Sequence, residues 1–402
     1  CIRDSYFTAG CCWVMQWILP PPKATSRVCT GTTSRSGNIF CTCSMASASF
    51  SSPYCGRMTA MRFMTAYLAA TPGEHTITGT ERMKQRPIKA LVDALRYIGA
   101  DITYVERDGY PPLHIRGRKL EGGHIEVPGD ISSQYISALL MIAPTLAGGL
   151  ELKLNGEIIS RPYIDLTLCM MRDFGADAEW SDVDTISVKP KAYAQRGFYI
   201  ENDWSAASYW YEMLVLGHDE ESEIMLTGLT DGSRQGDSAV KYLFSMLGVR
   251  TTFKTRERNV PTTVTLKCVE TKPPRLDYDF INQPDMVQTF VVCCALADIP
   301  FRFTGLSTLK IKETDRVEAL KTEMRKLGYI IRETGIGELS WDGERCEPAD
   351  DIVINTYEDH RMAMAFAPAS ITFPGLKIDN PQVVSKSYPV SYTHLRAHET
   401  SL

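Results

Sequence analysis

The chain has 402 residues, of which 44% are hydrophobic and 23% are charged. This composition is typical of a globular protein, and the length is sufficient for two domains of ordinary size. The sequence contains no apolar run long enough to span a membrane, and the net charge of −5 argues against nucleic acid as the main partner. We therefore expect neither a membrane nor a nucleic-acid partner, and an anionic ligand would need a local basic cleft.

The twelve cysteines are unevenly distributed, because seven of them lie within the first 55 residues. The other five lie in mostly apolar surroundings, as buried thiols do: Cys169, Cys268, Cys293, Cys294 and Cys346. This pattern predicts a reduced, cytoplasmic protein. No metal site is predicted, because Cys41 and Cys43 are too close for the usual zinc spacing and no histidine precedes His75.

Residues 1–58 differ from the rest of the chain. They are rich in serine, threonine and cysteine, contain one acidic residue, Asp4, and show no lasting helical or strand periodicity. Residues 1–5 can be encoded by bases whose reverse complement encodes Val-Ser-Tyr-Thr, which is the sequence of residues 390–393. Residues 1–5 and 390–402 therefore resemble a sequencing adapter translated at both ends. We expect residues 1–58 to be a non-native or disordered leader, and both out-of-frame translation and a genuine disordered leader remain open.

From Thr59 onward, one kind of helix recurs in the sequence. Its copies are predicted at residues 90–99, 166–175, 239–248 and 317–328, and each ends in an apolar residue, a glycine and a strand-like run. The four glycines are 76, 73 and 80 residues apart. Glycine at this place is typical of a helix that ends with a left-handed backbone conformation.

A second kind of helix alternates with the first. It begins with a small polar or charged cluster and continues almost wholly apolar, so we expect it to be buried. The copies begin near Thr59, Ser132, Trp204, Asp285 and Asp359, with spacings of 73, 72, 81 and 74 residues. This period is longer than that of a solenoid repeat. It fits a small unit with two helices and several strands, and repeated units of that kind predict packed α/β layers.

The N-termini of equivalent helices are expected to gather on one face of each domain, because repeated units point the same way. Helix N-termini carry free N–H groups and partial positive charge, so such a face attracts anions. The clusters at these N-termini are Thr59 with Arg62, Ser132 to Gln134, Asp203 with Ser205, Asp285, and Asp359 to Arg361. Each cluster alone fits ordinary helix capping. Together they favour a cleft that binds phosphate or carboxylate groups.

Five consecutive polar or charged residues, 312–316, separate a short alternating apolar run from an amphipathic helix that begins near residue 317. The run at residues 309–311 predicts the end of a strand. A strand end of this kind would present two cations and two carboxylates at the helix start, where a small anion could bind. The alternative is a solvated helix N-terminus capped by Thr314 or Asp315.

Six motifs between Thr59 and Met364 resemble those of a known family. They occur in the order Thr59-Ala-Met-Arg62, Arg82-Met-Lys-Gln-Arg-Pro-Ile88, Ser132-Ser-Gln134, Ser160-Arg-Pro-Tyr163, Lys312-Glu-Thr-Asp-Arg316 and Asp359-His-Arg-Met-Ala-Met364. Together they resemble 5-enolpyruvylshikimate-3-phosphate synthases, the enolpyruvyl transferases of the shikimate pathway. The resemblance extends from Thr59 to about Pro389.

The resemblance implies an α/β fold of two domains, each built from three βαβαββ units. Here the first unit would be truncated, because the family begins it with a Lys-Ser pair and a nearby arginine that nothing upstream of Thr59 matches. Residues 59–199 would form an incomplete N-terminal substrate domain and residues 200–389 the C-terminal catalytic domain. The crossover between them is expected at residues 197–203, which fall between two repeats.

The resemblance also implies an activity. The family transfers the enolpyruvyl group of phosphoenolpyruvate to the 5-hydroxyl of shikimate 3-phosphate and releases phosphate. It uses no metal and no organic cofactor, and its members are usually monomers. The expected partners are therefore the two small-molecule substrates, and a monomer is expected.

Roles for individual residues follow from the same resemblance. Phosphoenolpyruvate would be held by Arg82, Arg316 and Arg361, with Gln134 and Lys386 nearby. Shikimate 3-phosphate would be held by Ser132, Ser133, Ser160 and Lys312, with Tyr163 against its ring and Thr308 where the family more often has asparagine. The addition and elimination steps need an acid and a base. The family's candidates are Glu313 as acid and proton shuttle, Asp285 as base, and Lys386 as a group that shares the proton transfer.

Simpler interpretations of several residues remain open. Asp285 follows Pro284 and could be only a helix cap, and Asp203 could cap a helix at the crossover without touching substrate. Arg82 could be a surface charge, and His360 could be a buried residue behind the site.

Two rival functions also remain. One is UDP-N-acetylglucosamine enolpyruvyl transferase, which shares the fold but uses a reactive cysteine in a loop of the first domain. The other is a catalytically dead fragment that binds shikimate 3-phosphate. Because the first unit lacks its expected motif and Gly56-Arg57-Met58 replaces the family's glycine-rich turn, we expect the activity of this chain to be impaired.

Overall fold

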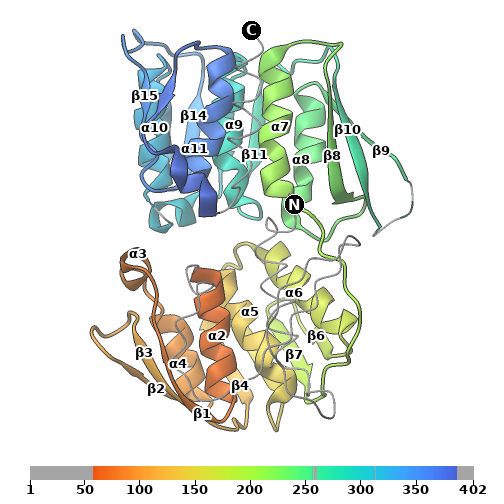
Figure 1. Cartoon of the computed structure of the whole chain (residues 1–402), viewed down its shortest axis with the longest axis vertical. Helices are drawn as coiled ribbons and strands as arrows, with labels where there is room; N and C mark the ends of the chain where they lie inside the picture. The colour runs from red at the N-terminus through yellow and green to blue at the C-terminus, as the bar shows by residue number, and fades with distance from the viewer. Residues whose placement is uncertain (1–57, 256, 258–259, 313, 387–402) are drawn as a thin grey trace. The chain divides into compact units, whose positions relative to one another are not determined.

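The computed structural model describes residues 58–255, 257, 260–312 and 314–386 of the chain. The predicted leader up to residue 57, the adapter-like tail and the candidate acid Glu313 lie outside these residues. The described residues form two compact units (Figure 1). The N-terminal unit comprises residues 58–158 and 167–197, and the C-terminal unit comprises residues 159–166 and 198–386.

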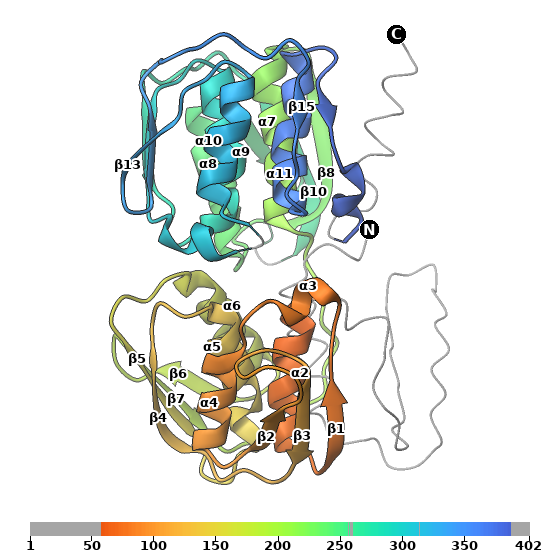
Figure 2. The ribbon, with the colours of Figure 1, turned by 90° about the vertical axis from the view of Figure 1, so that its left-hand side faces the viewer.

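The N-terminal unit contains two sheets with helices packed against them. The first sheet is antiparallel in the order β1-β3-β2, and the second has the order β4-β5-β7-β6, in which only β4 and β5 are parallel. The strands are β1 (Gly73–Ile77), β2 (Asp101–Tyr104), β3 (Leu113–Gly117), β4 (Gly123–Pro128), β5 (Leu150–Asn155), β6 (Asp177–Trp180) and β7 (Thr185–Lys189). The helices are α2 (Met58–Ala70), α3 (Glu81–Lys84), α4 (Lys89–Tyr97), α5 (Ser133–Ile142), η2 (Ala143–Thr145) and, from residue 167 onward, α6 (Arg161–Asp173), whose first turns belong to the C-terminal unit. Helices α2, α4 and α5 pack side by side (Figure 2).

The C-terminal unit contains an antiparallel sheet β8-β10-β9, a mixed sheet β11-β12-β14-β13 and the parallel pair β15-β16. The strands are β8 (Glu223–Thr230), β9 (Val249–Phe253), β10 (Pro261–Cys268), β11 (Leu276–Asp279), β12 (Phe301–Thr304), β13 (Arg332–Gly335), β14 (Glu338–Trp341), β15 (Val353–Ile354) and β16 (Lys377–Ile378). The helices are α7 (Trp204–Gly217), α8 (Val240–Met246), α9 (Val287–Leu296), α10 (Arg316–Lys326) and α11 (His360–Phe366). Short 3-10 helices are η3 (Gly236–Ala239), η4 (Pro284–Met286), η5 (Ser307–Ile311), η6 (Ala367–Ile371) and η7 (Pro381–Lys386).

The repeated α/β unit predicted from the sequence is present in both parts of the chain. One complete βαβαββ unit runs β4-α5-β5-α6-β6-β7 and another runs β11-α9-β12-α10-β13-β14, and their sheets have the same strand order and directions. The segments α2-β1-α4-β2-β3 and α7-β8-α8-β9-β10 follow the same plan from the first helix onward. The fold is therefore α/β, built from repeated βαβαββ units.

The predicted ends of the first helix type are confirmed. Helices α4, α6, α8 and α10 are each followed by a glycine with a positive φ: Gly99, Gly175, Gly248 and Gly328, at 99°, 89°, 85° and 89°. This left-handed conformation strains any residue with a side chain. It lets the chain leave the helix and reach the next strand, which begins one to four residues after the glycine.

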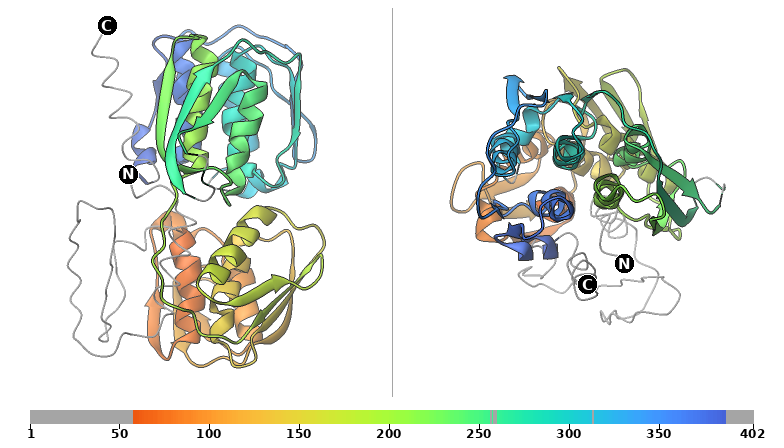
Figure 3. Two further views of the ribbon diagram at one scale, coloured as in Figure 1. Left: turned by 90° about the vertical axis from the view of Figure 1, so that its right-hand side faces the viewer. Right: turned by 90° about the horizontal axis from the view of Figure 1, so that it is seen from above.

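The second helix type forms the buried centre of the C-terminal unit. Every residue of α9 from Val287 to Ala295 is buried, and α9 packs against both α7 and α11. Viewed from above, these helices are seen end-on with the strands outside them (Figure 3). A helix that is apolar on all faces is stable in water only when it is covered on all sides. Burial of a side chain such as Phe290 contributes roughly 1.5–3 kcal/mol.

Two details of the chain differ from the sequence predictions. Residues 309–311 were expected to end a strand, but Ser307–Ile311 forms the 3-10 helix η5, because strand β12 has already ended and Gly305 turns the chain with φ 74°. Residues 159–166, expected in the first domain, belong to the C-terminal unit. The Ser160 amide donates a hydrogen bond to the Ile281 carbonyl, 3.1 Å away.

None of the helices among the described residues is long and apolar enough to cross a membrane.

Candidate active site

Three aspartates lie at the N-termini of the three buried helices α7, α9 and α11, which run side by side in the C-terminal unit (Figure 1). Asp203 caps α7 by accepting a hydrogen bond from the Ser205 amide at 2.8 Å. Asp359 caps α11 by accepting one from the Arg361 amide at 2.9 Å. Asp285 lies in η4 just before α9, where Gln283 and Met286 hold the N-cap positions of the two helices. The repeat therefore brings equivalent carboxylates together, and one of them is available for other contacts.

Arg316 links two of these aspartates. It begins α10 with only 1% of its surface exposed. Its Nε donates to Asp359 Oδ2 at 2.7 Å, and its Nη1 donates to Asp285 Oδ1 at 2.9 Å. Asp359 is completely buried. A buried carboxylate needs a charged partner, so Arg316 holds the starts of α9, α10 and α11 together.

Two further cations approach Asp285. Arg361 Nη2 donates to Asp285 Oδ2 at 3.0 Å, and Arg361 Nη1 donates to the Asp285 carbonyl at 3.2 Å. Lys312 Nζ lies 3.9 Å from Asp285 Oδ1. The side chains of Lys312, Arg361 and Asp285 are 30%, 14% and 21% exposed. Unlike Arg316, these groups can therefore meet a ligand that arrives from solvent.

These cations control the charge of Asp285. Burial alone would raise the pKa of its carboxyl, but the positive charges of Arg361, Lys312 and Arg316 together hold that pKa well below its ordinary value. In the absence of a ligand, Asp285 is thus a carboxylate with little affinity for a proton. An anion that binds Lys312 and Arg361 would offset their charge and raise the basicity of Asp285.

A second group of buried polar side chains adjoins Arg361. Asp237 is 3% exposed and accepts hydrogen bonds from the Tyr163 hydroxyl at 3.3 Å and from the Ser205 hydroxyl. Burial raises the pKa of Asp237, and the negative charge of Asp285 raises it further. Burial and the charge of Asp237 also raise the pKa of Asp203 to about 6, against the attraction of Arg361. Arg361 is thus a shared counterion for several carboxylates.

Replacing Asp203 with asparagine is expected to stabilise the protein at neutral pH. The folded chain holds the Asp203 proton more tightly than the unfolded chain, whose aspartates titrate near pH ~4. Ionisation of Asp203 therefore lowers stability as the pH rises from about 4 to about 6, and this cost persists above that range. Asparagine keeps the helix cap and carries no charge. Urea unfolding should show a gain of about 1–2 kcal/mol at pH 7.5 and none at pH 4.

The control for this prediction is Asp277→Asn, which removes a carboxylate paired with Arg275 at 2.7 Å on the exposed part of β11. It should show no gain at pH 7.5. A gain for Asp203→Asn of equal size at both pH values would contradict the assigned cause.

The N-terminal unit has its own cluster at the starts of α2 and α5. Arg62 Nη1 donates to Gln134 Oε1 at 2.6 Å and to Ser132 Oγ at 3.3 Å. The Arg62 guanidinium lies over the Tyr135 ring at 4.7 Å, and the Tyr135 hydroxyl donates to the Pro87 carbonyl at 2.6 Å. Arg62 was predicted to belong to the polar clusters that favour an anion-binding cleft and to the first family motif, but no substrate contact was predicted for it. The structure adds that its guanidinium joins the start of α2 to the polar side chains at the start of α5.

The remaining predicted residues lie as follows. Arg82 is exposed on α3, where its Nη1 donates to Gln85 Oε1 at 3.4 Å. Ser133 opens α5, and Thr308 is half-buried in η5. Ser160 is buried and has a φ of 55°, a strained conformation for a residue with a side chain. Lys386 ends η7, and the placement of its side chain lies outside the part of the chain that the structure describes.

Three other predictions, which concern Asp285, Asp315 and His360, can be compared with the structure. Asp315 caps α10 by accepting a hydrogen bond from the Glu318 amide at 3.1 Å, as predicted. The suggestion that Asp285 is only a helix cap is wrong, because its carboxylate is occupied by arginines. His360 is one-quarter exposed, with Nδ1 3.7 Å from Asp359 Oδ1. Asp237 and Ser205 were not among the predicted substrate residues.

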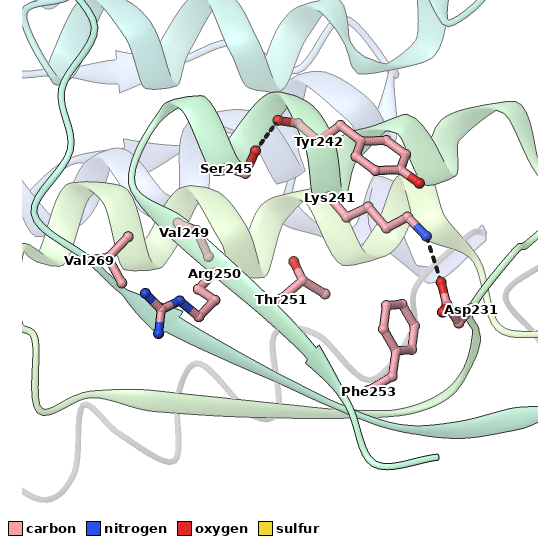
Figure 4. A pocket seen from close by; sticks show the side chains of 9 residues that line it. All are labelled: Asp231, Lys241, Tyr242, Ser245, Val249, Arg250, Thr251, Phe253 and Val269. Atoms are coloured by element: carbon pink, nitrogen blue, oxygen red, sulfur yellow. Dashed lines mark hydrogen bonds and ion pairs between the residues drawn. The ribbon is translucent and has the colours of Figure 1, made fainter. Parts of the chain in front are cut away.

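A surface hollow of about 390 Å³ lies elsewhere in the C-terminal unit, between α8 and β9 (Figure 4). Its lysine, Lys241, is 8% exposed and forms an ion pair with Asp231 at 3.1 Å. Its Nζ also lies 5.1 Å from the centre of the Phe253 ring. Lys241 is therefore already neutralised and packed, which makes this hollow a poorer anion site than the region around Lys312. Among the described residues, no group of three histidines, cysteines or acids is arranged to hold a metal ion.

Comparison with known proteins agrees with this geometry. A model of the EPSP synthase family (3-phosphoshikimate 1-carboxyvinyltransferase) matches residues 48–395. The 3-phosphoshikimate 1-carboxyvinyltransferase of Bacteroides fragilis is 58% identical over 338 residues, which cover 84% of this chain and 80% of that protein. The protein of the same name from Shewanella halifaxensis is 36% identical over 343 residues, or 84% of this chain and 77% of that protein.

Solved structures support the same fold. The EPSP synthase of Acinetobacter baumannii is similar with a TM-score of 0.67 at 20% identity, over 85% of this chain and 77% of that chain. The enolpyruvyl transferase NikO of Streptomyces tendae has a TM-score of 0.63 at 16% identity, over 88% and 79% of the two chains. The fold, the paired arginines around Asp285 and the match over most of the sequence lead to one conclusion: this chain belongs to the EPSP synthase family.

Proposed function

We propose that this chain transfers the enolpyruvyl group of phosphoenolpyruvate to the 5-hydroxyl of shikimate 3-phosphate and releases phosphate. The observation that carries the proposal is the cluster in which Lys312, Arg316 and Arg361 surround Asp285. A site with three cations and one carboxylate suits a reaction in which both substrates are anionic and a hydroxyl must lose its proton.

The cations in this cluster are proposed to have different tasks. Arg361 and Lys312 are partly exposed, so they would meet the phosphate and carboxylate groups of the substrates directly. Arginine can grip such a group with two parallel hydrogen bonds. Arg316 is almost completely buried between Asp285 and Asp359. A substrate anion would have to compete with these carboxylates to reach it, so its main contribution is to keep the cluster in place.

Asp285 is proposed to act as the base that takes the hydroxyl proton. Its low proton affinity in the free site follows from the surrounding cations. Binding of the anionic substrates would offset those cations and raise the basicity of Asp285 only once the reactants are present. Glu313 as the acid and Lys386 as a group that shares the proton transfer are proposed from the family resemblance alone.

The other substrate contacts are proposed in the same way. Ser132, Ser133 and Gln134 would bind substrate oxygens at the start of α5, with Arg62 holding two of these side chains by its hydrogen bonds. Ser160, Tyr163 and Thr308 would contact shikimate 3-phosphate, and Arg82 would contact phosphoenolpyruvate. We also propose that the protein is cytoplasmic and that it is a monomer. Size-exclusion chromatography with light scattering tests the oligomeric state.

Calorimetry of the full chain tests the substrate. Shikimate 3-phosphate is expected to bind and UDP-N-acetylglucosamine is expected not to bind. Binding of the nucleotide sugar alone would favour the sister transferase, and binding of neither ligand would contradict the proposal.

Turnover of the full chain is expected to be slow. Residues upstream of Thr59 contain no counterpart of the Lys-Ser pair with which the family contacts both substrates. A chain without this cation would bind and orient its substrates less well. The measurement is phosphate release from both substrates together. Rapid release would overturn the expected impairment, whereas shikimate 3-phosphate binding with no release at all would favour the dead-fragment alternative.

A further inference from the structure

We propose that Asp237 is a positioning residue for shikimate 3-phosphate, which it serves by fixing the hydroxyl of Tyr163. This inference rests on the proposed function, in which the Tyr163 ring lies against the substrate ring. Asp237 lies in η3 and is not among the residues predicted to touch either substrate. Its side chain is 3% exposed, so it would act through other groups.

The contacts of Asp237 join three separate segments. Both of its carboxylate oxygens lie 3.3 Å from the Tyr163 hydroxyl, which belongs to α6. Its Oδ2 also accepts a hydrogen bond from the Ser205 hydroxyl in the first turn of α7. Asp237 thus connects the start of α6, η3 and the start of α7 around one buried carboxyl group.

The direction of these hydrogen bonds follows from charge. Burial raises the pKa of the Tyr163 phenol well above its ordinary value, and the charges of Asp237 and Asp285 raise it further. Tyr163 therefore keeps its proton and donates it toward Asp237. A hydrogen bond between a hydroxyl and a carboxylate is stronger than one between neutral groups. The bond to Asp237 therefore fixes the side-chain torsions of Tyr163 and the position of its ring.

The backbone packing beside Asp237 leaves little freedom for this group. A Cβ atom added to Gly236 would lie 2.6 Å from Pro162 Cβ, a distance too short for two carbon atoms. The segment before Asp237 therefore touches the segment before Tyr163 directly. Gln235 is also tied down, because its Nε2 donates to Glu201 Oε2 at 3.0 Å and to the Asn202 carbonyl at 2.8 Å. The Asp237 carboxylate is consequently held at one place relative to Tyr163.

Affinity for shikimate 3-phosphate, measured by calorimetry on the full chain, tests the proposal. Asp237→Asn and Tyr163→Phe are each expected to weaken binding about tenfold. Asparagine at position 237 offers one acceptor oxygen, whereas the hydroxyls of both Tyr163 and Ser205 donate to this side chain. Phenylalanine at position 163 keeps the ring but loses the hydroxyl. The double variant should bind no more weakly than either single variant, because both changes remove the same interaction. A general loss of packing would instead give effects that add.

Two controls accompany these variants. Tyr211→Phe removes a phenol that contacts Thr251 Oγ1 at 2.8 Å, and Asp277→Asn removes a carboxylate from the exposed part of β11. Neither should change the affinity. The proposal is overturned if Tyr163→Phe binds like the unsubstituted chain, or if the effects of the two changes add. Tyr163→Phe decides the matter alone if Asp237→Asn does not fold.

The failure of the proposed function would look different. In that case the unsubstituted chain would not bind shikimate 3-phosphate at all, which overturns the role of Asp237 together with the function. If the unsubstituted chain binds and the variants bind equally well, only the role of Asp237 is overturned.

Discussion

Replacing Arg316 with alanine is expected to lower the free energy of unfolding by about 3–5 kcal/mol, the range for breaking a buried ion pair by removing one partner. The guanidinium is 1% exposed and neutralises Asp359, which is completely buried. Without it, the Asp359 carboxylate would be left in the interior without this partner. The measurement is urea unfolding of the full chain at pH 7.5, followed by circular dichroism.

The matched control is Arg332→Ala. Arg316 makes two hydrogen bonds to the Asp359 carboxylate, and Arg332 makes two to the Glu344 carboxylate, but the side chains of Arg332 and Glu344 are 63% and 41% exposed. Exposed pairs of this kind contribute roughly 0–1 kcal/mol. Equal losses for the two variants would show that burial of Asp359 and Arg316 carries no special cost.

The stability that Arg316 provides should also depend on pH through Asp285. Cations hold the pKa of Asp285 below its value in the unfolded chain, so its ion pairs contribute fully above pH ~4. This contribution is lost as the pH falls further. The difference between the unsubstituted chain and Arg316→Ala should therefore shrink below pH ~4.

Replacing Asp285 with asparagine is expected to lower turnover at least ~100-fold. Asparagine has nearly the same shape but cannot accept the hydroxyl proton. Because the turnover of this chain is expected to be slow, the measurement is single-turnover phosphate release with the protein in excess over both substrates. Binding of shikimate 3-phosphate, measured by calorimetry, should fall much less than turnover, since two arginines and Lys312 remain.

Asp277→Asn serves as the control for this prediction, because it removes a carboxylate from the exposed part of β11. Turnover of Asp285→Asn comparable to that of Asp277→Asn would assign the proton acceptor to another group. A parallel loss of turnover and binding would instead show that Asp285 mainly holds substrate.

Much of the local structure was determined by the sequence itself. The glycines at positions 99, 175, 248 and 328 ended their helices as predicted, because few residues other than glycine adopt a positive φ at low cost. The apolar run of α9 predicted a fully buried helix, since such a helix must be covered in water. The spacing of these elements revealed the repeated α/β unit, and the motifs around Lys312 and Arg361 indicated the family.

The tertiary structure alone decided how the charged residues share their partners. Asp203, Asp285 and Asp359 occupy equivalent helix starts, and local sequence favours capping for all three. Two of them cap, whereas Asp285 is held by arginines that lie 31 and 76 residues away along the chain. Its low proton affinity is a sum of charges that only folding brings within a few ångströms. The same applies to Asp237, whose partners in α6 and α7 lie 74 and 32 residues away.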